Sequence, residues 1–159
     1  MRILLLLSAA LLIQSCKSVK EPFDADSIQV IKANNGVNAY LCDNSLSFNS
    51  YDCSVDANNN KINNIIKVLT KYPNSKVTVH GFCDDVGSEA INKTLSFKRA
   101  KTVKNYLVSK GIDPKRIKIK AYGEDSPFVP NNSNENRAKN RKVICSVALS
   151  KKDVLLAKQ

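Results

Sequence analysis

The sequence has little of what most catalytic, metal-binding or cofactor sites require. It contains a single histidine, His80, and no two cysteines stand in a C-x-x-C arrangement, which argues against a zinc site. Gly-rich phosphate loops, nucleophile elbows and zinc-protease motifs do not occur in the sequence. No nucleophile can be matched with a base, so we expect neither an enzyme nor a bound metal or cofactor.

Aromatic residues are also scarce, at 6% of the chain, although Lys and Arg outnumber Asp and Glu by 25 to 14. The net charge of +11 makes acidic polymers or surfaces plausible neighbours. However, the lysines are scattered rather than interleaved with stacking aromatic rings, which argues against nucleic-acid binding. With 159 residues, 43% of them hydrophobic and only five Gly and five Pro, the chain is expected to form one globular domain with a tail or targeting segment.

The amino terminus has the pattern of an export signal. Arg2 precedes an apolar run over residues 3–13 that is too short for a stable membrane anchor, so residues 1–15 are interpreted as a signal peptide. The stretch "LLIQSC" resembles a bacterial lipobox, in which Cys16 becomes the acylated first residue of the mature protein. An uncleaved helical anchor, or an incidental thiol at Cys16, is the alternative. Residues 16–36 then form a lipid-anchored flexible tether, with room for one extended piece at 27–33.

Export would place the four remaining cysteines, Cys42, Cys53, Cys83 and Cys145, in an oxidising compartment. Four cysteines allow three complete pairings, and their spacing does not choose among them. Our hypothesis is that Cys42 pairs with Cys53, because they flank one strand-like segment. Cys83 would pair with Cys145 if their strands adjoin.

Hydrophobic periodicity divides the rest of the chain into alternating strands and helices. Ile62, Ile65, Ile66 and Leu69 follow the spacing of one buried helical face, and Pro73 ends that helix. A longer helix is predicted over 88–110, with Gly111 at its cap. Strands are expected at 37–41, 46–48, 76–83, 116–123 and 142–149. One short helix is expected at 135–140, and residues 151–159 are expected to form a frayed tail. This order predicts an α/β sandwich with helices on one face of a mixed sheet.

Arg99 lies in the middle of the apolar arc of the longer helix, where a guanidinium is unexpected. A buried arginine keeps its proton, so it needs an anion nearby. Asp84 and Asp85 follow the preceding strand and are the candidates. Two interpretations remain open, an internal salt bridge or a cleft in which both charges face a ligand.

Residues 81–143 carry a specific pattern of motifs. They contain G-x-x-D-x-x-G, N-x-x-L-S-x-x-R-A and Y-G-E-x-x-P, followed by an N-R-K-V sequence. The anchored positions are Gly81, Asp84, Gly87, Asn92, Leu95, Ser96, Arg99, Ala100, Tyr122 to Pro127, Asn131, Arg137 and Asn140 to Val143. In these motifs the chain resembles the OmpA C-terminal-like domain, the family of peptidoglycan-associated lipoproteins, with weaker similarity back to about residue 37.

The resemblance implies a βαβαβ(α)β domain over residues 37–150 that binds peptidoglycan non-covalently through the diaminopimelate of its stem peptide. By transfer from the family, Asp84 would accept the ammonium group of diaminopimelate and Arg99 would bind its carboxylate. Asn92 and nearby backbone groups would hold the remainder of the ligand. Cys83, Asp85 and Arg141 complete the candidate ligand-binding set.

The chain departs from the family pattern at Phe82 and Cys83, where His and Thr are usual, at Asp85, commonly Asn, and at Lys142, usually Arg. We therefore expect an altered affinity or stem-peptide preference. The resemblance implies a lipoprotein of the outer membrane whose domain faces the periplasm and tethers membrane to cell wall. The alternative is an envelope protein that has lost this ligand and binds a protein or acidic lipid.

Overall fold

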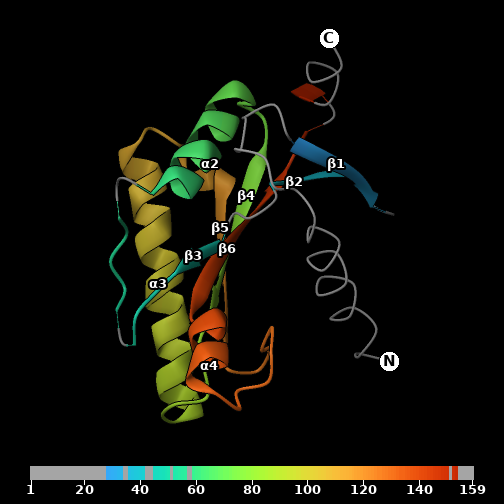
Figure 1. Cartoon of the computed structure of the whole chain (residues 1–159). Coiled ribbons are helices and arrows are strands. Elements are labelled where there is room, and N and C mark those ends of the chain that lie inside the picture. Colours follow the sequence, from blue (N-terminus) through green and yellow to red (C-terminus); the bar gives the residue numbers. More distant parts are fainter. Residues whose placement is uncertain are drawn as a thin grey trace.

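The structure is a computed structural model of the chain (Figure 1). It describes residues 28–33, 36–41, 45–50, 52–56, 59–150 and 152–153. The expected signal peptide, Cys16 and Cys42 lie outside these residues. Within the described ranges, no helix combines the length and the apolar character that crossing a membrane requires.

Helix α2 (Asn60–Lys71) forms where the sequence predicts it, because its first and last turns are both capped. The Asn59 side chain accepts a hydrogen bond from the amide of Lys61, and the chain leaves the helix at Tyr72, just before Pro73. At the other end, Arg116 donates to the carbonyls of Leu69 and Tyr72, both at 2.8 Å. These are carbonyls that the last turn of a helix leaves unsatisfied.

Helix α3 (Glu89–Ser109) has the predicted length and position. Ser88 accepts a hydrogen bond from the amide of Ile91, and Glu89 places a negative charge in the first turn, where the helix dipole favours it. Gly111 has a φ of +88° just beyond the helix, which explains why glycine occurs there. The predicted short helix is α4 (Asn134–Asn140), and a 3-10 turn, η1, covers Pro114–Arg116.

The strands form one mixed sheet in the order β1-β2-β6-β4-β5, with β3 also paired to β6. Only the β4–β5 pair is parallel among the pairings described, and the other pairs are antiparallel. Helices α2 and α3 lie together on one side of the sheet, so the predicted α/β fold is confirmed (Figure 1). The strand bounds are β1 (Ile28–Ala33), β2 (Gly36–Leu41), β3 (Ser45–Ser47), β4 (Lys76–Phe82), β5 (Ile117–Gly123) and β6 (Lys142–Ala148).

Both ends of the domain extend further than the sequence analysis expected. Strand β1 falls inside the predicted tether, 16–36, and pairs along its whole length with β2. At the other end, Asp153 lies in the stretch 151–159 predicted to be a frayed tail. Its buried carboxylate accepts hydrogen bonds from Ser75 and Ser150, at 2.7 and 2.9 Å.

The two faces of β4 have different environments. Val77 and Val79 are fully buried on the face that α3 covers. His80 is on the opposite face, where its ring nitrogens contact Tyr122 Oη and Ser146 Oγ, both at 3.1 Å. Burial lowers the pKa of His80 to about 4, so the ring is neutral at physiological pH. His80 is therefore held by side chains on the face of the sheet opposite α3.

Gly81 allows α3 to approach β4 closely enough to bring the end of the strand beside the helix. A Cβ at this position would overlap the carbonyl oxygen of Ser96 and crowd the Ala100 methyl group. The element that comes this close is the backbone of α3 itself. This contact fixes the distance between Arg99 on the helix and Asp84, which follows the strand.

We predict that Gly81→Ala lowers the free energy of unfolding by about 3 kcal/mol or more, because the helix backbone cannot yield to the added methyl group. Gly111→Ala is the control, since nothing lies within 4 Å of its Cβ position. That variant should cost only about 1 kcal/mol, from its positive φ. Urea unfolding of both variants measures the difference, and equal losses would contradict this account of the packing.

Candidate functional site

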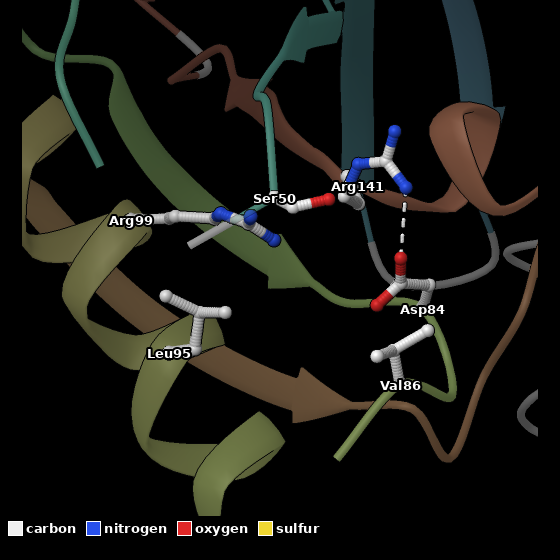
Figure 2. Close-up of a pocket in the computed structure, with 6 residues that line it drawn as sticks. All are labelled: Ser50, Asp84, Val86, Leu95, Arg99 and Arg141. Carbon is white, nitrogen blue, oxygen red and sulfur yellow. Dashed lines mark hydrogen bonds and ion pairs between the residues drawn. The ribbon is translucent and has the colours of Figure 1, made fainter. Parts of the chain in front are cut away.

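A small hollow lies at the end of the sheet where β4 ends and β6 begins. It is lined by Ser50, Asp84, Val86, Leu95, Arg99 and Arg141. Figure 2 shows Arg99 reaching in from α3, with Asp84 and Arg141 on the other side. The cavity volume is about 10 Å³, which is about the space that one water molecule needs.

Arg99 is completely buried, at 0% exposure, and its guanidinium donates to four acceptors. Nε and Nη2 donate to the backbone carbonyls of Asp52 and Asn49, both at 2.9 Å. Nη1 donates to the Phe82 carbonyl at 3.2 Å and to Cys83 Sγ at 3.4 Å. Arg99 therefore joins α3 to the end of β4 and to the segment that follows β3.

The charge of Arg99 has no carboxylate partner among the described residues, because the ion pairs found there join other residues. The salt bridge between Arg99 and Asp84, which the sequence left open, is not formed. Four of the five guanidinium N–H groups are engaged, so one N–H of Nη2 is left without a partner in the described part of the chain. Burying a cation without a directly paired carboxylate is costly, which makes Arg99 a candidate for binding an anion.

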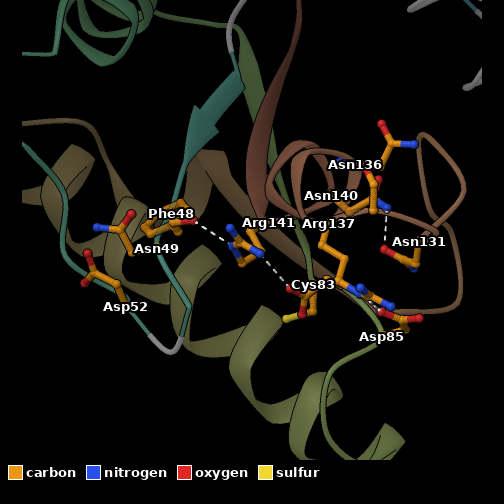
Figure 3. Close-up of polar contacts among 12 residues, drawn as sticks. Phe48, Asn49, Asp52, Cys83, Asp85, Asn131, Asn136, Arg137, Asn140 and Arg141 are labelled. Atoms are coloured by element: carbon orange, nitrogen blue, oxygen red, sulfur yellow. Dashed lines mark hydrogen bonds and ion pairs between the residues drawn. The ribbon is translucent and has the colours of Figure 1, made fainter.

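Asp84 is paired with Arg141 instead. Asp84 is buried, at 6% exposure, and its Oδ2 lies 2.8 Å from Nη1 of Arg141. Nε of Arg141 also donates to the Phe48 carbonyl at 3.3 Å, which holds the guanidinium over the hollow (Figure 3). The hollow thus contains two guanidinium groups and one carboxylate.

Arg141 is positioned by the residue before it in sequence. The buried amide of Asn140 accepts hydrogen bonds from the backbone of Phe128 and Val129, and donates to the Val129 carbonyl and to Asn131 Oδ1. These bonds fasten the β5–α4 loop to the end of α4. The Asn131 and Asn140 positions of the motif therefore have a structural explanation, since they fix where Arg141 lies and where β6 begins.

Asp85 lies beside the hollow but does not line it. Its carboxylate accepts a hydrogen bond from Nε of Arg137 at 2.8 Å, and this bond holds the pKa of Asp85 below its usual range (Figure 3). The two neighbouring aspartates thus pair with two arginines one helical turn apart, Asp84 with Arg141 and Asp85 with Arg137. The structure consequently places the second acid outside the hollow.

Asn92 is on the same face of α3 as Arg99, but two helical turns earlier. Its side chain is fully buried and donates to Glu124, and Oδ1 has no partner among the described residues. Asn92 does not line the hollow. It connects α3 to the loop after β5, so the structure separates it from the Asp84–Arg99–Arg141 group.

The Cys83 thiol lies directly beneath the guanidinium of Arg99. It donates to the Asn92 carbonyl at 3.3 Å, and burial raises its pKa to about 11, so it is protonated at neutral pH. In place of the usual Thr, Cys83 therefore still provides one donor and one acceptor.

The predicted Cys83–Cys145 disulfide is wrong, because Cys83 is a free thiol. Their strands do adjoin, but Cys145 is opposite Val79 in the β4–β6 register. Cys83 lies four residues further along, roughly 13 Å away, whereas a disulfide needs a Cα separation of about 4–7 Å. Cys53 is a free thiol as well, so the Cys42–Cys53 pairing is not made in the structure, and Cys42 itself lies outside the described residues.

Sequence reasoning missed Ser50, Val86 and Leu95 as lining residues, together with the carbonyls of Asn49 and Asp52. Leu95 was visible only as part of a motif, and backbone carbonyls have no side-chain signature. Asp84, Arg99 and Arg141, which the motifs did identify, are the three charged residues that the fold brings together.

The sequence model of the OmpA family matches residues 47–141. The chain belongs to the OmpA family. This match contains the whole hollow, from Ser50 to Arg141. The family assignment also agrees with the motifs on which the resemblance was based.

Curated relatives of this OmpA-family chain include envelope and peptidoglycan-binding proteins. Peptidoglycan-binding protein ArfA of Mycobacterium tuberculosis is 40% identical over 82 residues, covering 52% of this chain and 25% of the relative. The probable lipoprotein YiaD of Escherichia coli is 33% identical over 101 residues, covering 63% and 46%. The chain thus spans between a quarter and a half of the length of these relatives.

Solved structures with the same fold include the peptidoglycan-associated lipoprotein of Burkholderia pseudomallei. That structure has a TM-score of 0.62 at 21% identity, covering 65% of this chain and 88% of the other. The C-terminal domain of Helicobacter pylori MotB has a TM-score of 0.56 at 25% identity, covering 72% and 91%. Both likenesses support the OmpA-like fold.

We predict that iodoacetamide at pH 8 modifies Cys53 in the folded protein and spares Cys83. A thiol with a pKa of about 11 is only about one part in a thousand thiolate at that pH, and Cys83 is also buried, whereas Cys53 is partly exposed. Mass spectrometry after short labelling identifies the modified residues, and labelling in urea provides the control in which both react. Equal labelling in the folded state would contradict the Arg99–Cys83 arrangement.

Proposed function

We propose that this OmpA-family domain binds peptidoglycan non-covalently, through the diaminopimelate residue of the stem peptide. The observation that carries the proposal is the buried Arg99 charge, which faces a hollow and has one N–H without a partner in the described chain. Diaminopimelate presents an ammonium and a carboxylate on one carbon atom. Asp84 and Arg99, on opposite sides of the hollow, match these two charges.

Binding on this proposal proceeds by an exchange of ionic partners. In the structure Arg141 is paired with Asp84, and the cavity has room for about one water molecule. The ligand ammonium takes the place of Arg141 at Asp84, and the released guanidinium moves to the ligand carboxylate, which also receives the remaining N–H of Arg99. One ion pair is replaced by two, and the movement of Arg141 opens space for the ligand.

The apolar part of the hollow also suits diaminopimelate. Val86 and Leu95 lie along one side, next to the charged groups (Figure 2). Val86 is 48% exposed, although it is a large apolar residue. The methylene chain of the ligand can cover these side chains while its charged end enters between Asp84 and Arg99, and about 25 cal/mol of stabilisation accompanies each Å² of apolar surface removed from water.

The proposal extends to a role as a tether. An acylated Cys16 would hold the protein in the outer membrane, with the domain in the periplasm gripping the cell wall. Two weak attachments joined by a linker hold together more strongly than either alone. The similarity to the probable lipoprotein YiaD and to outer membrane porin F of Pseudomonas fluorescens, 40% identical over 86 residues, supports an envelope location.

Asp84→Asn is the sharpest test of this site. Asparagine has the same shape and can still accept a hydrogen bond from Arg141, but it cannot pair with an ammonium. We expect binding of the full chain to purified sacculi, and to diaminopimelate by calorimetry, to weaken by about 10-fold to 100-fold, the loss of one charge-assisted hydrogen bond. Arg99→Ala is a poorer choice, because Arg99 also holds the Asn49 and Asp52 carbonyls.

Asp85→Asn is the matched control, because it removes the same charge from the neighbouring residue, whose partner is Arg137 outside the hollow. Binding by this variant should equal that of the wild type. If Asp84→Asn binds as well as Asp85→Asn, the site assignment is wrong. Binding that disappears with salt and ignores diaminopimelate would instead favour a domain that uses its basic surface for a protein or acidic lipid.

A further inference from the structure

We infer that the hollow distinguishes between two forms of the stem peptide. The difference lies in the carboxyl group on the same carbon atom as the ammonium of diaminopimelate, which we call the head carboxyl. The hollow selects peptides in which the head carboxyl is a free carboxylate over those in which it is amidated. The inference rests on the proposed function and adds a chemical preference at the same site. It follows from the charges that line the hollow and from the hydrogen-bonding capacity of its two arginines.

The charged residues of the hollow do not balance one another. Arg99 and Arg141 contribute two positive charges, and Asp84 contributes one negative charge. The remaining lining residues, Ser50, Val86 and Leu95, are neutral. Asp85, the nearest acid in sequence, is occupied by Arg137 and lies outside the hollow.

A ligand with an ammonium alone makes this imbalance worse. Its charge can be neutralised by Asp84, but Arg141 then loses its partner, and two guanidinium groups face one another without an anion. An arginine side chain has only donors and no acceptor, so neither can satisfy the other. A free carboxylate resolves the conflict because it accepts from both arginines.

An amidated head carboxyl cannot satisfy both arginines in this way. Its carbonyl oxygen can accept hydrogen bonds, but its NH₂ group presents donors toward two side chains that are themselves only donors. The burial of Arg99 increases the penalty, since few waters can intervene at a guanidinium with 0% exposure. Arg141 is therefore a specificity-determining residue, because its release from Asp84 creates the second demand for an anion.

The test compares two synthetic tripeptides, L-Ala-γ-D-Glu-meso-diaminopimelate and the same peptide amidated at the head carboxyl of diaminopimelate. Calorimetric titration of the full chain should give an affinity for the amidated peptide at least about 10-fold weaker. Equal affinities for the two peptides would overturn the inference and leave the proposed function standing. Failure of both peptides to bind would overturn the proposed function itself.

Two variants test whether Arg141 is responsible for the preference for a free carboxylate. Arg141→Gln should bring the affinities for the two peptides closer together than in the wild type, because only Arg99 then requires the carboxylate. Arg137→Gln removes the same charge one helical turn away, from the pair with Asp85, and should keep the full preference. Circular dichroism checks that both fold, and if Arg141→Gln does not, the wild-type comparison alone decides. An undiminished preference in folded Arg141→Gln would overturn the role of Arg141.

Discussion

The structure depends on a buried guanidinium that is held by neutral groups. Arg99 donates to backbone carbonyls of Asn49, Asp52 and Phe82 and to the Cys83 thiol, and these bonds join three segments that are distant in sequence. Carbonyl dipoles satisfy its donors but do not neutralise its charge. The same side chain thus joins these segments and, on the proposed function, binds the anionic group of the ligand.

Asp84 contributes the one negative charge of the hollow, and this charge is already paired. Its ion pair with Arg141 keeps a buried carboxylate from being isolated, and on the proposed function the ligand competes with that pair. The competition favours a ligand that returns an anion to Arg141 as it takes Asp84. Affinity and selectivity on this account are two consequences of a single exchange.

Sequence patterns predicted the parts of the fold that arise locally. Helices α2 and α3 follow from apolar spacing, from capping by Asn59 and Ser88, and from Gly111, and β4 to β6 follow from alternation of apolar residues. The membership of β1 in the sheet could not be predicted in the same way, because it depends on long-range pairing. Strand register also decides the cysteine geometry, and it places Cys145 opposite Val79 rather than near Cys83.

The candidate site could be predicted only in part, because its pairings also depend on long-range contacts. Motifs located Asp84, Arg99 and Arg141, but only the fold shows that Arg141, and not Arg99, pairs with Asp84, and that Asn92 lies apart. The most direct measurement is a crystal structure with bound diaminopimelate. The account predicts the ligand ammonium on Asp84 and its carboxylate on Arg99 and Arg141. A ligand bound elsewhere, with the Asp84–Arg141 pair intact, would contradict it.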